Sequence, residues 1–533
     1  MTSERSPLRD ARTVALAALV ALALHLVWAL WLSPDGRDLA AQTFWTRFAA
    51  DRPGHAYTFS WYGGAHPASY SLLSPHLLAW GGVRPVAVAC GTLSAALLAL
   101  LLVRLRAPAA LAASLWGAVA LSGNVFSFRV TFGIGLTAAL AALYAAVAVR
   151  GRRARVALVA LLGVTASLAS PVAGLFLLVA GVALLITGDT GGRSPGRGTG
   201  AALVVGLPLV AGMTSLLFPA EGVQPISLRS VVLPAAACTA AVLVAAPRSW
   251  VAVRVGALVY LLGIGLTYAV PSPVGSNVER LALLFGGALL LSAVAAARRT
   301  WQVAVLGAAL LVSGGWSVVK PLEDQIDARP ALASARGAAA LRAALDRHGA
   351  RLSRVEVVPL RSHWEASGLA RDYALARGWN RQLDTDRHAL FYDGRLTAAS
   401  YRDWLRRWAV GFVVLPAQPL DKAGRAEAAL IARGLPYLTE IHRDARWHLY
   451  RVRDAVPIAS APARVTAQDT AALTVTVPSP GTTTLRVAWS PWLAASGDAC
   501  LTRDGAFATL RTTKPGHYRI TAPLTWPRGT PCP

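Results

Sequence analysis

The sequence predicts a polytopic α-helical membrane protein with about eleven transmembrane helices, an extracytoplasmic α/β domain and a C-terminal β-sandwich. Of its 533 residues, 55% are hydrophobic and only 15% are charged, whereas soluble domains carry about 25% charged residues. The apolar runs end near Trp316 and a more polar texture follows. We therefore expect a transmembrane domain at 1–318, with a long first external loop at 33–84, an α/β domain at 319–455 and a β-sandwich at 456–533.

Apolar runs long enough to span a membrane define the first domain. Runs of about 17 to 21 residues can cross a hydrocarbon core of about 30 Å as helices. They occur near 14–32, 85–103, 130–149, 201–218, 250–270, 279–297 and 301–318. Shorter or more ambiguous runs occur near 108–122, 156–169, 172–187 and 231–246. Together they predict eleven spans.

Arginine placement predicts the orientation. Cytoplasmic loops carry an excess of basic residues. The predicted spans place the arginine-bearing loops at 104–106, 150–155, 193–197, 248 and 298–299 on the same side of the membrane as the basic N-terminus. We expect a cell-membrane protein with a cytoplasmic N-terminus and, after an odd number of spans, extracytoplasmic C-terminal domains. The first apolar stretch is longer than the usual signal-peptide core of about 7 to 15 residues, so we expect a retained anchor.

The net charge of +25 does not indicate nucleic-acid binding. Three lysines accompany 49 arginines, and much of the positive excess follows the topology, so no nucleic-acid partner is expected. Cys90 and Cys238 fall in apolar spans, whereas Cys500 and Cys532 fall in the exported region. Since an oxidising compartment permits disulfides, we expect Cys500 and Cys532 to be bonded.

The region after the spans changes periodicity. "RVEVVPL" and "VGFVVLP" are short apolar runs flanked by helical stretches, which predicts a small α/β domain. From about 456, "ARVTA", "ALTVTV", "TTLRVAW", "FATLRTT" and "HYRITA" recur with Pro and Gly between them. Short strands at this spacing predict a β-sandwich.

Several common kinds of site are not expected. The segment "GDTGGRSPGRGTG" lacks the lysine of a phosphate-binding loop and is interpreted as a flexible linker. Cysteines and histidines lack zinc-ligand spacing. We expect no covalently bound cofactor.

The first external loop carries the candidate chemistry. Asp35 and Asp38 follow the first span directly, and Leu39, Phe44, Trp45 and Phe48 can share one face of a short helix. Such a helix is expected to lie in the membrane interface with its aromatic side chains toward lipid.

This layout resembles the GT-C superfamily of membrane glycosyltransferases, in particular actinobacterial arabinosyl- and mannosyltransferases. Members have many spans, acidic residues after the first span, an interfacial helix in a long first loop and external domains that include a β-sandwich. "HPASY" is similar to a His-Pro segment of some members, whereas the D-x-x-D spacing of Asp35 and Asp38 departs from the adjacent acidic pair. The resemblance implies a polyprenyl-phosphate sugar donor, held with membrane lipid, and a cell-envelope glycan or protein acceptor.

Sugar transfer requires a general base for the acceptor hydroxyl and a positive group for the leaving phosphate. Asp38 is the candidate base, with helix capping as its alternative role. Asp35 lies in "SPDG", so turn formation is the alternative for it. Arg280 is the candidate phosphate clamp, with snorkelling or pairing with Glu279 as alternatives. A divalent cation could serve the phosphate instead, and the sequence leaves the metal requirement open.

The segment "WYGGAHPASYSLLSPH" is expected to line the external mouth of the site. Trp61 and Tyr62 would present flat faces to the sugar or lipid, and His66 and His76 would offer hydrogen bonds. The alternative for each aromatic residue is an interface belt.

A second polar and aromatic set lies in the exported α/β domain. His363, Trp364, Glu365 and Trp379 could hold an acceptor glycan, but packing between domains is the favoured interpretation.

Two other functional classes remain open. A carrier of the major-facilitator kind would explain the many spans, but such carriers usually have twelve spans in two similar halves and no large external C-terminal region. A non-catalytic envelope scaffold would have the same domains without needing the aspartates.

Overall fold

The structure is a computed structural model that describes residues 7–33, 36–69, 71–188, 195–219, 222–328 and 333–532, with the side chains of 333–337 outside this description. The chain forms two compact units. The helical unit takes in 1–33, 71–217 and 223–326, and the mixed unit takes in 34–70, 218–222 and 327–533. The predicted first loop, 33–84, is therefore divided between the two units.

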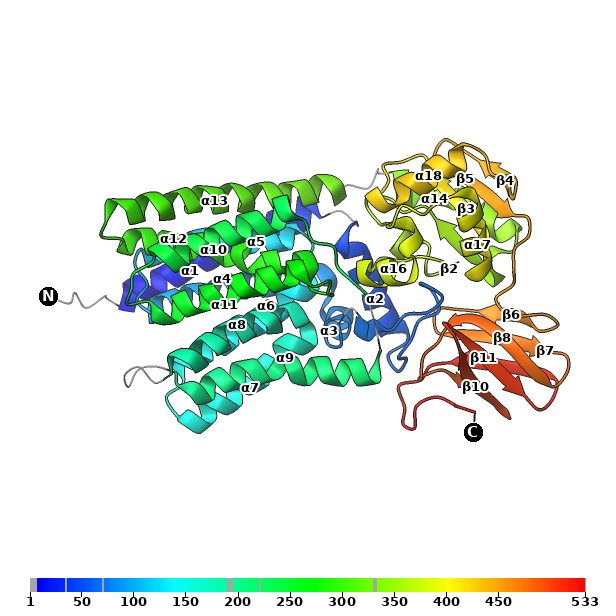
Figure 1. Cartoon of the computed structure of the whole chain (residues 1–533), viewed down its shortest axis with the longest axis horizontal. Helices are drawn as coiled ribbons and strands as arrows, with labels where there is room; N and C mark the ends of the chain where they lie inside the picture. Colours follow the sequence, from blue (N-terminus) through cyan, green and yellow to red (C-terminus); the bar gives the residue numbers. More distant parts are fainter. Residues whose placement is uncertain are drawn as a thin grey trace. The chain divides into compact units, whose positions relative to one another are not determined.

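Each predicted apolar run is helical in the helical unit, where the helices lie side by side (Figure 1). These helices are α1 (Pro7–Val27), α4 (Val83–Arg104), α5 (Ala110–Phe126), α6 (Val130–Ala148), α7 (Arg152–Ala169), α8 (Pro171–Thr187), α9 (Arg197–Leu217), α10 (Leu233–Ala245), α11 (Val251–Ala269), α12 (Arg280–Ala296) and α13 (Thr300–Ala328). The short helix α3 (Ser74–Gly81), the π-helical segments Trp28–Leu32 and Leu228–Val232 and the 3₁₀ turn Gly275–Glu279 complete the unit.

Eight segments of the described chain are long and apolar enough to cross a membrane. They are α1 with its π-helical end, α4, α6, α9, α10 with the turn before it, α11, α12 with the turn before it, and α13. Helices α5 and α8 are apolar but shorter. The protein is therefore a multi-pass membrane protein, while the count of eleven spans and the orientation of the termini stay predictions.

Glycine allows close helix contacts in this unit. A Cβ atom on Gly181 of α8 would lie 2.8 Å from the carbonyl oxygen of Gly200 on α9. Close backbone approach through small residues is a typical way for transmembrane helices to pack, because lipid gives no hydrophobic drive between them.

The mixed unit begins with helix α2 (Asp38–Asp51) and a 3₁₀ turn at Pro67–Ser69, and then forms an α/β part. Its sheet has the order β2-β1-β3-β5-β4, with β2, β1 and β3 parallel and the others antiparallel. The strands are β1 (Arg354–Val357), β2 (Ala374–Leu375), β3 (Val410–Pro416), β4 (Leu438–Arg443) and β5 (Trp447–Val452). The helices are α14 (Ala333–Arg347), α15 (Glu365–Gly368), α16 (Arg381–Arg387), α17 (Ala398–Arg407) and α18 (Arg425–Ala432), with 3₁₀ turns at Ala350–Leu352, Ala389–Phe391 and Lys422–Gly424.

The C-terminal part of the mixed unit consists of two antiparallel sheets, β6-β7-β12-β9 and β10-β11-β8 (Figure 1). Their strands are β6 (Arg464–Gln468), β7 (Ala472–Val477), β8 (Gly481–Ala488), β9 (Ala494–Ala495), β10 (Ala499–Asp504), β11 (Phe507–Thr512) and β12 (Gly516–Thr521). A disulfide joins Cys500 to Cys532, the pair expected from the sequence.

Helix α2 forms, but the prediction that its aromatic face lies toward lipid is wrong. Phe44, Trp45 and Phe48 are at most 5% exposed and belong to the hydrophobic core of the mixed unit. The Phe44 ring stacks on Trp61 with centroids 4.1 Å apart, and Leu341 packs in the same cluster. The rings therefore bury their apolar area against protein rather than lipid.

Candidate functional site

Charged side chains meet inside the otherwise apolar helical unit. The Arg129 guanidinium lies 3.6 Å from the Glu279 carboxylate and 3.4 Å from that of Asp324. The Lys320 ammonium lies 3.4 Å from Asp324. Arg129, Glu279 and Asp324 are each at most 9% exposed. Ionisable groups buried in a membrane-spanning region are costly, so they generally mark a functional site.

Two helix starts bring this cluster together. Arg129 is the residue before α6, and Glu279 is the residue before α12. Because the N-terminal end of a helix carries a partial positive charge, these two starts add to the positive potential there. Asp324 comes from the last turns of α13.

Arg280, the predicted phosphate clamp, begins α12 next to Glu279. Its guanidinium lies over the Phe132 ring of α6, 4.9 Å from the centroid. We call Arg129, Arg280, Lys320, Glu279 and Asp324 the charged cluster. It holds three cations and two carboxylates and is therefore positive overall. The Oε2 atom of Glu279 is buried and has no hydrogen-bond partner among the described residues.

Asp38, the predicted base, is the first residue of α2 and is half-buried. The alternative role of capping is not seen, because Arg37 occupies the capping position and no side chain caps this helix. The Asp38 side chain forms no hydrogen bond or ion pair with the residues that the structure describes. Asp35 lies outside the described residues.

The immediate surroundings of Asp38 are fixed by backbone contacts and charges. The Arg37 N–H donates to the Ser362 carbonyl at 2.6 Å. Asp327 accepts ion pairs from Arg361 at 3.1 Å and from Arg37 at 3.8 Å. The start of α2 is therefore held against the loop after β1, and its carboxylate remains available for a ligand.

The predicted sugar-facing role of Trp61 and Tyr62 is not supported by their positions, because both rings are 0% exposed. The Trp61 indole N–H donates to the Ala366 carbonyl at 3.0 Å, so the ring is anchored in the core. His66 is 5% exposed and its Nδ1 atom lies 2.8 Å from the Ala56 carbonyl. Burial lowers the pKa of His66 to about 4. His76 is exposed on α3 of the helical unit, whereas the other three residues belong to the mixed unit.

The second predicted set forms a closed cluster in the mixed unit. His363 is 2% exposed, and its ring stacks on Trp379 with centroids 3.5 Å apart. Its two nitrogens lie 3.6 Å from Glu365 and 3.4 Å from Asp421. Trp364 is 7% exposed in the core. Three of the four predicted side chains are therefore buried within the mixed unit, and Trp379 is partly exposed.

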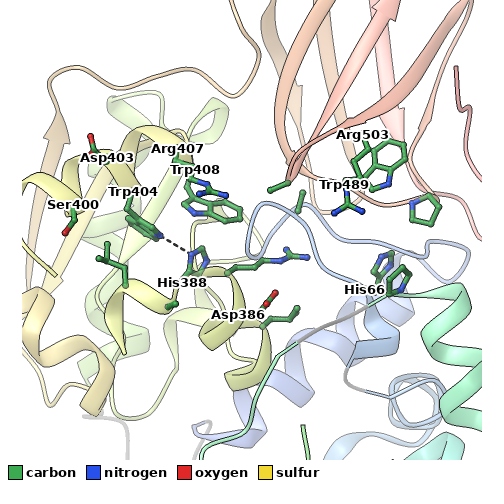
Figure 2. A pocket seen from close by; sticks show the side chains of 18 residues that line it. His66, Asp386, His388, Ser400, Asp403, Trp404, Arg407, Trp408, Trp489 and Arg503 are labelled. Carbon is green, nitrogen blue, oxygen red and sulfur yellow. Dashed lines mark hydrogen bonds between the residues drawn. The ribbon is translucent and has the colours of Figure 1, made fainter. Parts of the chain in front are cut away.

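One cavity was missed by sequence reasoning. A cavity of about 730 Å³ lies within the mixed unit, and side chains from α17 and from the loops after β8 and β10 line it (Figure 2). Its polar and aromatic lining residues include His66, Arg387, His388, Asp403, Trp404, Arg407, Trp408, Trp489 and Arg503. Of these, only His66 was singled out from the sequence.

Among the described residues, no group of three or more His, Cys, Asp or Glu side chains could hold a metal ion. The divalent cation considered from the sequence therefore has no identified ligand set in this part of the chain.

Comparison with known proteins gives a short family match and two remote structural likenesses. A family model described as a domain of unknown function, DUF8823, matches residues 460–500. No curated protein matches the sequence. The structure of the arabinofuranosyltransferase AftD from Mycobacteria is similar, with 17% identity and a TM-score of 0.42, over 90% of this chain and 43% of that chain. The present chain thus spans less than half the length of that protein.

The crystal structure of an Archaeoglobus fulgidus oligosaccharyltransferase tethered to an acceptor peptide is also similar. Its identity is 10% and its TM-score is 0.46, over 76% of this chain and 69% of that chain. Both names denote sugar-transferring enzymes. Likenesses at these scores assign neither an activity nor a substrate to this chain.

Proposed function

We propose that this protein is a membrane glycosyltransferase that moves a sugar from a polyprenyl-phosphate donor to a hydroxyl group of a cell-envelope glycan or protein. The single observation that carries the proposal is the charged cluster. A net positive group enclosed by apolar helices suits a lipid-linked anion, because the lipid tail can remain in the membrane while the cations meet the phosphate. Guanidinium groups suit this task since they bind phosphate oxygens in pairs.

The proposed reaction has one displacement step. The acceptor oxygen attacks the anomeric carbon and the bond from that carbon to the phosphate oxygen breaks. The electron pair leaves with the phosphate, whose added charge Arg280 stabilises. The acceptor proton passes to Asp38. Asp38 follows the end of the first span by six residues, so connectivity keeps it near the membrane surface.

The reaction is proposed for the outer face of the membrane. The arginine-rich loops support a cytoplasmic N-terminus and an exported mixed unit. Impermeant thiol reagents should label His517→Cys from outside intact cells and should leave Arg106→Cys unlabelled. Labelling of Arg106→Cys from outside would contradict this orientation.

The test of the function begins with donor binding. Purified full-length protein in lipid nanodiscs should bind undecaprenyl phosphate, and Arg280→Ala should weaken that binding by about tenfold or more because it removes a charge partner. Arg254→Ala on α11 is the matched control, since Arg254 is also a half-buried arginine of the helical unit but is not in the charged cluster.

The outcomes separate the alternatives. Equal binding by wild type and Arg280→Ala, or no binding by wild type, would contradict the proposed donor site. Donor binding without transfer to any envelope glycan would favour the scaffold, which has the same domains without the catalytic chemistry.

A further inference from the structure

The cavity in the mixed unit has the dimensions of a small-ligand site. Its volume of about 730 Å³ falls within the range of about 300–1,000 Å³ that is typical of ligand pockets. In Figure 2, His388, Trp404 and Trp408 lie on one side, and Trp489, Arg503 and His66 lie on the other. The proposed transfer reaction uses none of these residues.

One face of α17 supplies much of one wall. Ser400, Asp403, Trp404 and Arg407 all line the cavity and stand at helical positions i, i+3, i+4 and i+7. Residues at this spacing share one face of a helix. Arg402 and Arg406 do not line the cavity, and Arg402 instead pairs with Asp454. The helix therefore presents a mixed aromatic and charged face to the cavity.

The aromatic wall is held in place by its own contacts. The Trp404 indole N–H donates to His388 Nδ1 at 3.0 Å, and the Trp404 ring lies parallel to Tyr401 with centroids 5.9 Å apart. Trp408 meets His388 edge-on at 4.7 Å. Burial lowers the pKa of His388 to about 3, so this ring stays neutral. A wall fixed before binding lowers the cost of ordering it around a ligand.

The polar groups of the lining are of both signs. Arg387, Arg407 and Arg503 can donate hydrogen bonds, while Asp386 and Asp403 can accept them. Arg387 is oriented by a bond from Nη1 to the Tyr62 carbonyl at 2.9 Å. The many charges disfavour an acyl chain.

These features match the chemistry of a sugar. Each sugar hydroxyl both donates and accepts hydrogen bonds, so it can use guanidinium and carboxylate groups together. The C–H face of a sugar ring is apolar and packs on an indole ring, a contact that the half-buried Trp489 can offer, whereas Trp404 and Trp408 are only 6% and 3% exposed. We infer that this cavity binds a neutral oligosaccharide. Its further role, holding the acceptor glycan during transfer, rests on the proposed function.

Direct binding tests the inference without relying on transfer. Full-length protein in nanodiscs is titrated calorimetrically with maltotetraose, cellotetraose, mannotetraose and xylotetraose. Nanodiscs replace maltoside detergents here because a maltoside headgroup is itself a saccharide. At least one tetrasaccharide should bind wild type, and Trp489→Ala and Arg407→Ala should each weaken that binding by about tenfold or more.

Matched controls come from the same elements. Arg406→Ala changes the neighbouring exposed arginine of α17, and Trp526→Ala removes an exposed tryptophan of the C-terminal part that does not line the cavity. Both should stay within about twofold of wild type, because contacts outside a binding site are nearly neutral. A second measurement keeps the test valid if the wall variants, Trp489→Ala and Arg407→Ala, misfold. The bound tetrasaccharide should slow alkylation of the cysteine in Arg407→Cys but not of the cysteine in Arg406→Cys.

Three results would overturn the inference. They are failure of all four sugars to bind wild type, full binding by both wall variants, and tighter binding of inorganic pyrophosphate that displaces the sugar. Failure here with intact undecaprenyl phosphate binding would leave the proposed function standing. Sugar binding without undecaprenyl phosphate binding would leave the cavity a saccharide site and contradict the proposed function instead.

Discussion

The Tyr62 hydroxyl accepts a hydrogen bond from the Asn380 N–H at 2.9 Å and donates one to the carbonyl of the same residue at 3.1 Å. Tyr62 is completely buried, so no water can replace either bond. Residues 318 positions apart are thereby joined. This relationship assigns Tyr62 to the structure of the mixed unit rather than to the sugar contact expected from the sequence.

Tyr62→Phe should therefore destabilise the mixed unit by about 1–3 kcal/mol, because two buried backbone groups lose their partner. Hydrogen exchange of the Asn380 amide in the full-length protein should accelerate accordingly. The KM for acceptor should not change. A raised KM with unchanged exchange would instead support the sugar-contact role.

The membrane helices and most strands could be predicted because their signals are local. Each span is a long apolar run, and β1 and β3 are short apolar runs between polar segments. The aromatic stripe of α2 is different, because the same stripe suits a lipid interface and a protein core. The protein core is the environment found, because the stripe packs in one cluster with Leu341. Leu341 lies almost 300 residues further along the chain, so the local sequence could not show this contact.

The charged cluster and the cavity could be predicted only in part. Glu279 and Arg280 were noted from the sequence, but Arg129, which pairs with both Glu279 and Asp324, precedes α6, and Asp324 lies on α13. The spacing of Ser400, Asp403, Trp404 and Arg407 is visible in the sequence as a helix face. What lies opposite that face depends on the β-sandwich residues Trp489 and Arg503, so long-range packing alone creates the opening.

Arg129→Gln should strongly destabilise the helical unit. It leaves the buried Glu279 without its ion-pair partner, and removing one member of a buried pair typically costs about 3–5 kcal/mol. Unfolding by SDS titration in mixed micelles measures this loss. Arg254→Gln is the control and should change the unfolding free energy by at most about 0.5 kcal/mol. Equal stability of the two variants would argue against a structural role for the pair.

The buried network around Arg377 predicts a pH dependence of stability. Arg377 pairs with Asp384 at 2.8 Å and Glu427 at 3.2 Å, and Glu356 lies 3.7 Å away. Burial raises the pKa of Glu427 from 4.5 to about 7. Between these values the folded state holds a proton that the unfolded state has lost, so this group makes stability fall as the pH rises from about 4.5 to about 7.

Glu427→Gln should reduce the pH slope, since an amide does not titrate and its lack of charge also lowers the raised pKa of the neighbouring Glu356. Hydrogen exchange of strand β3 at pH 5 and pH 8 in wild type and variant measures it. The buried histidines His66 and His388, whose pKa values are lowered to about 4 and about 3, give the opposite slope in both proteins and cancel in the comparison. Identical slopes would show that Glu427 is ionised throughout this range.

The disulfide should stabilise the C-terminal part of the mixed unit. It closes a loop across a sequence separation of 32, and a loop of this size contributes about 2–4 kcal/mol. The double variant Cys500→Ser with Cys532→Ser should therefore melt at a lower temperature, and added reductant should lower the melting temperature of wild type only. Free-thiol labelling of both residues in the native exported protein would refute the bond.

Asp38→Asn gives the sharpest test of the catalytic assignment. Asparagine keeps the size of the side chain, and no capping bond is lost because Asp38 caps nothing in α2. The substitution removes only the favourable charge at the helix start, which should lower the free energy of unfolding by about 0.3–1 kcal/mol. Folding should therefore persist. The kcat of sugar transfer should fall by about 10²–10⁴-fold, the usual contribution of a general base, with little change in donor binding.

Asp51→Asn is the matched control, because Asp51 is exposed at the other end of the same helix. It should keep full activity, and Asp35→Asn should cost much less than Asp38→Asn if Asp35 only turns the chain. Full transfer activity in Asp38→Asn would remove Asp38 from the mechanism. The base would then have to be sought among other carboxylates, beginning with the buried Glu279, whose Oε2 atom has no hydrogen-bond partner among the described residues.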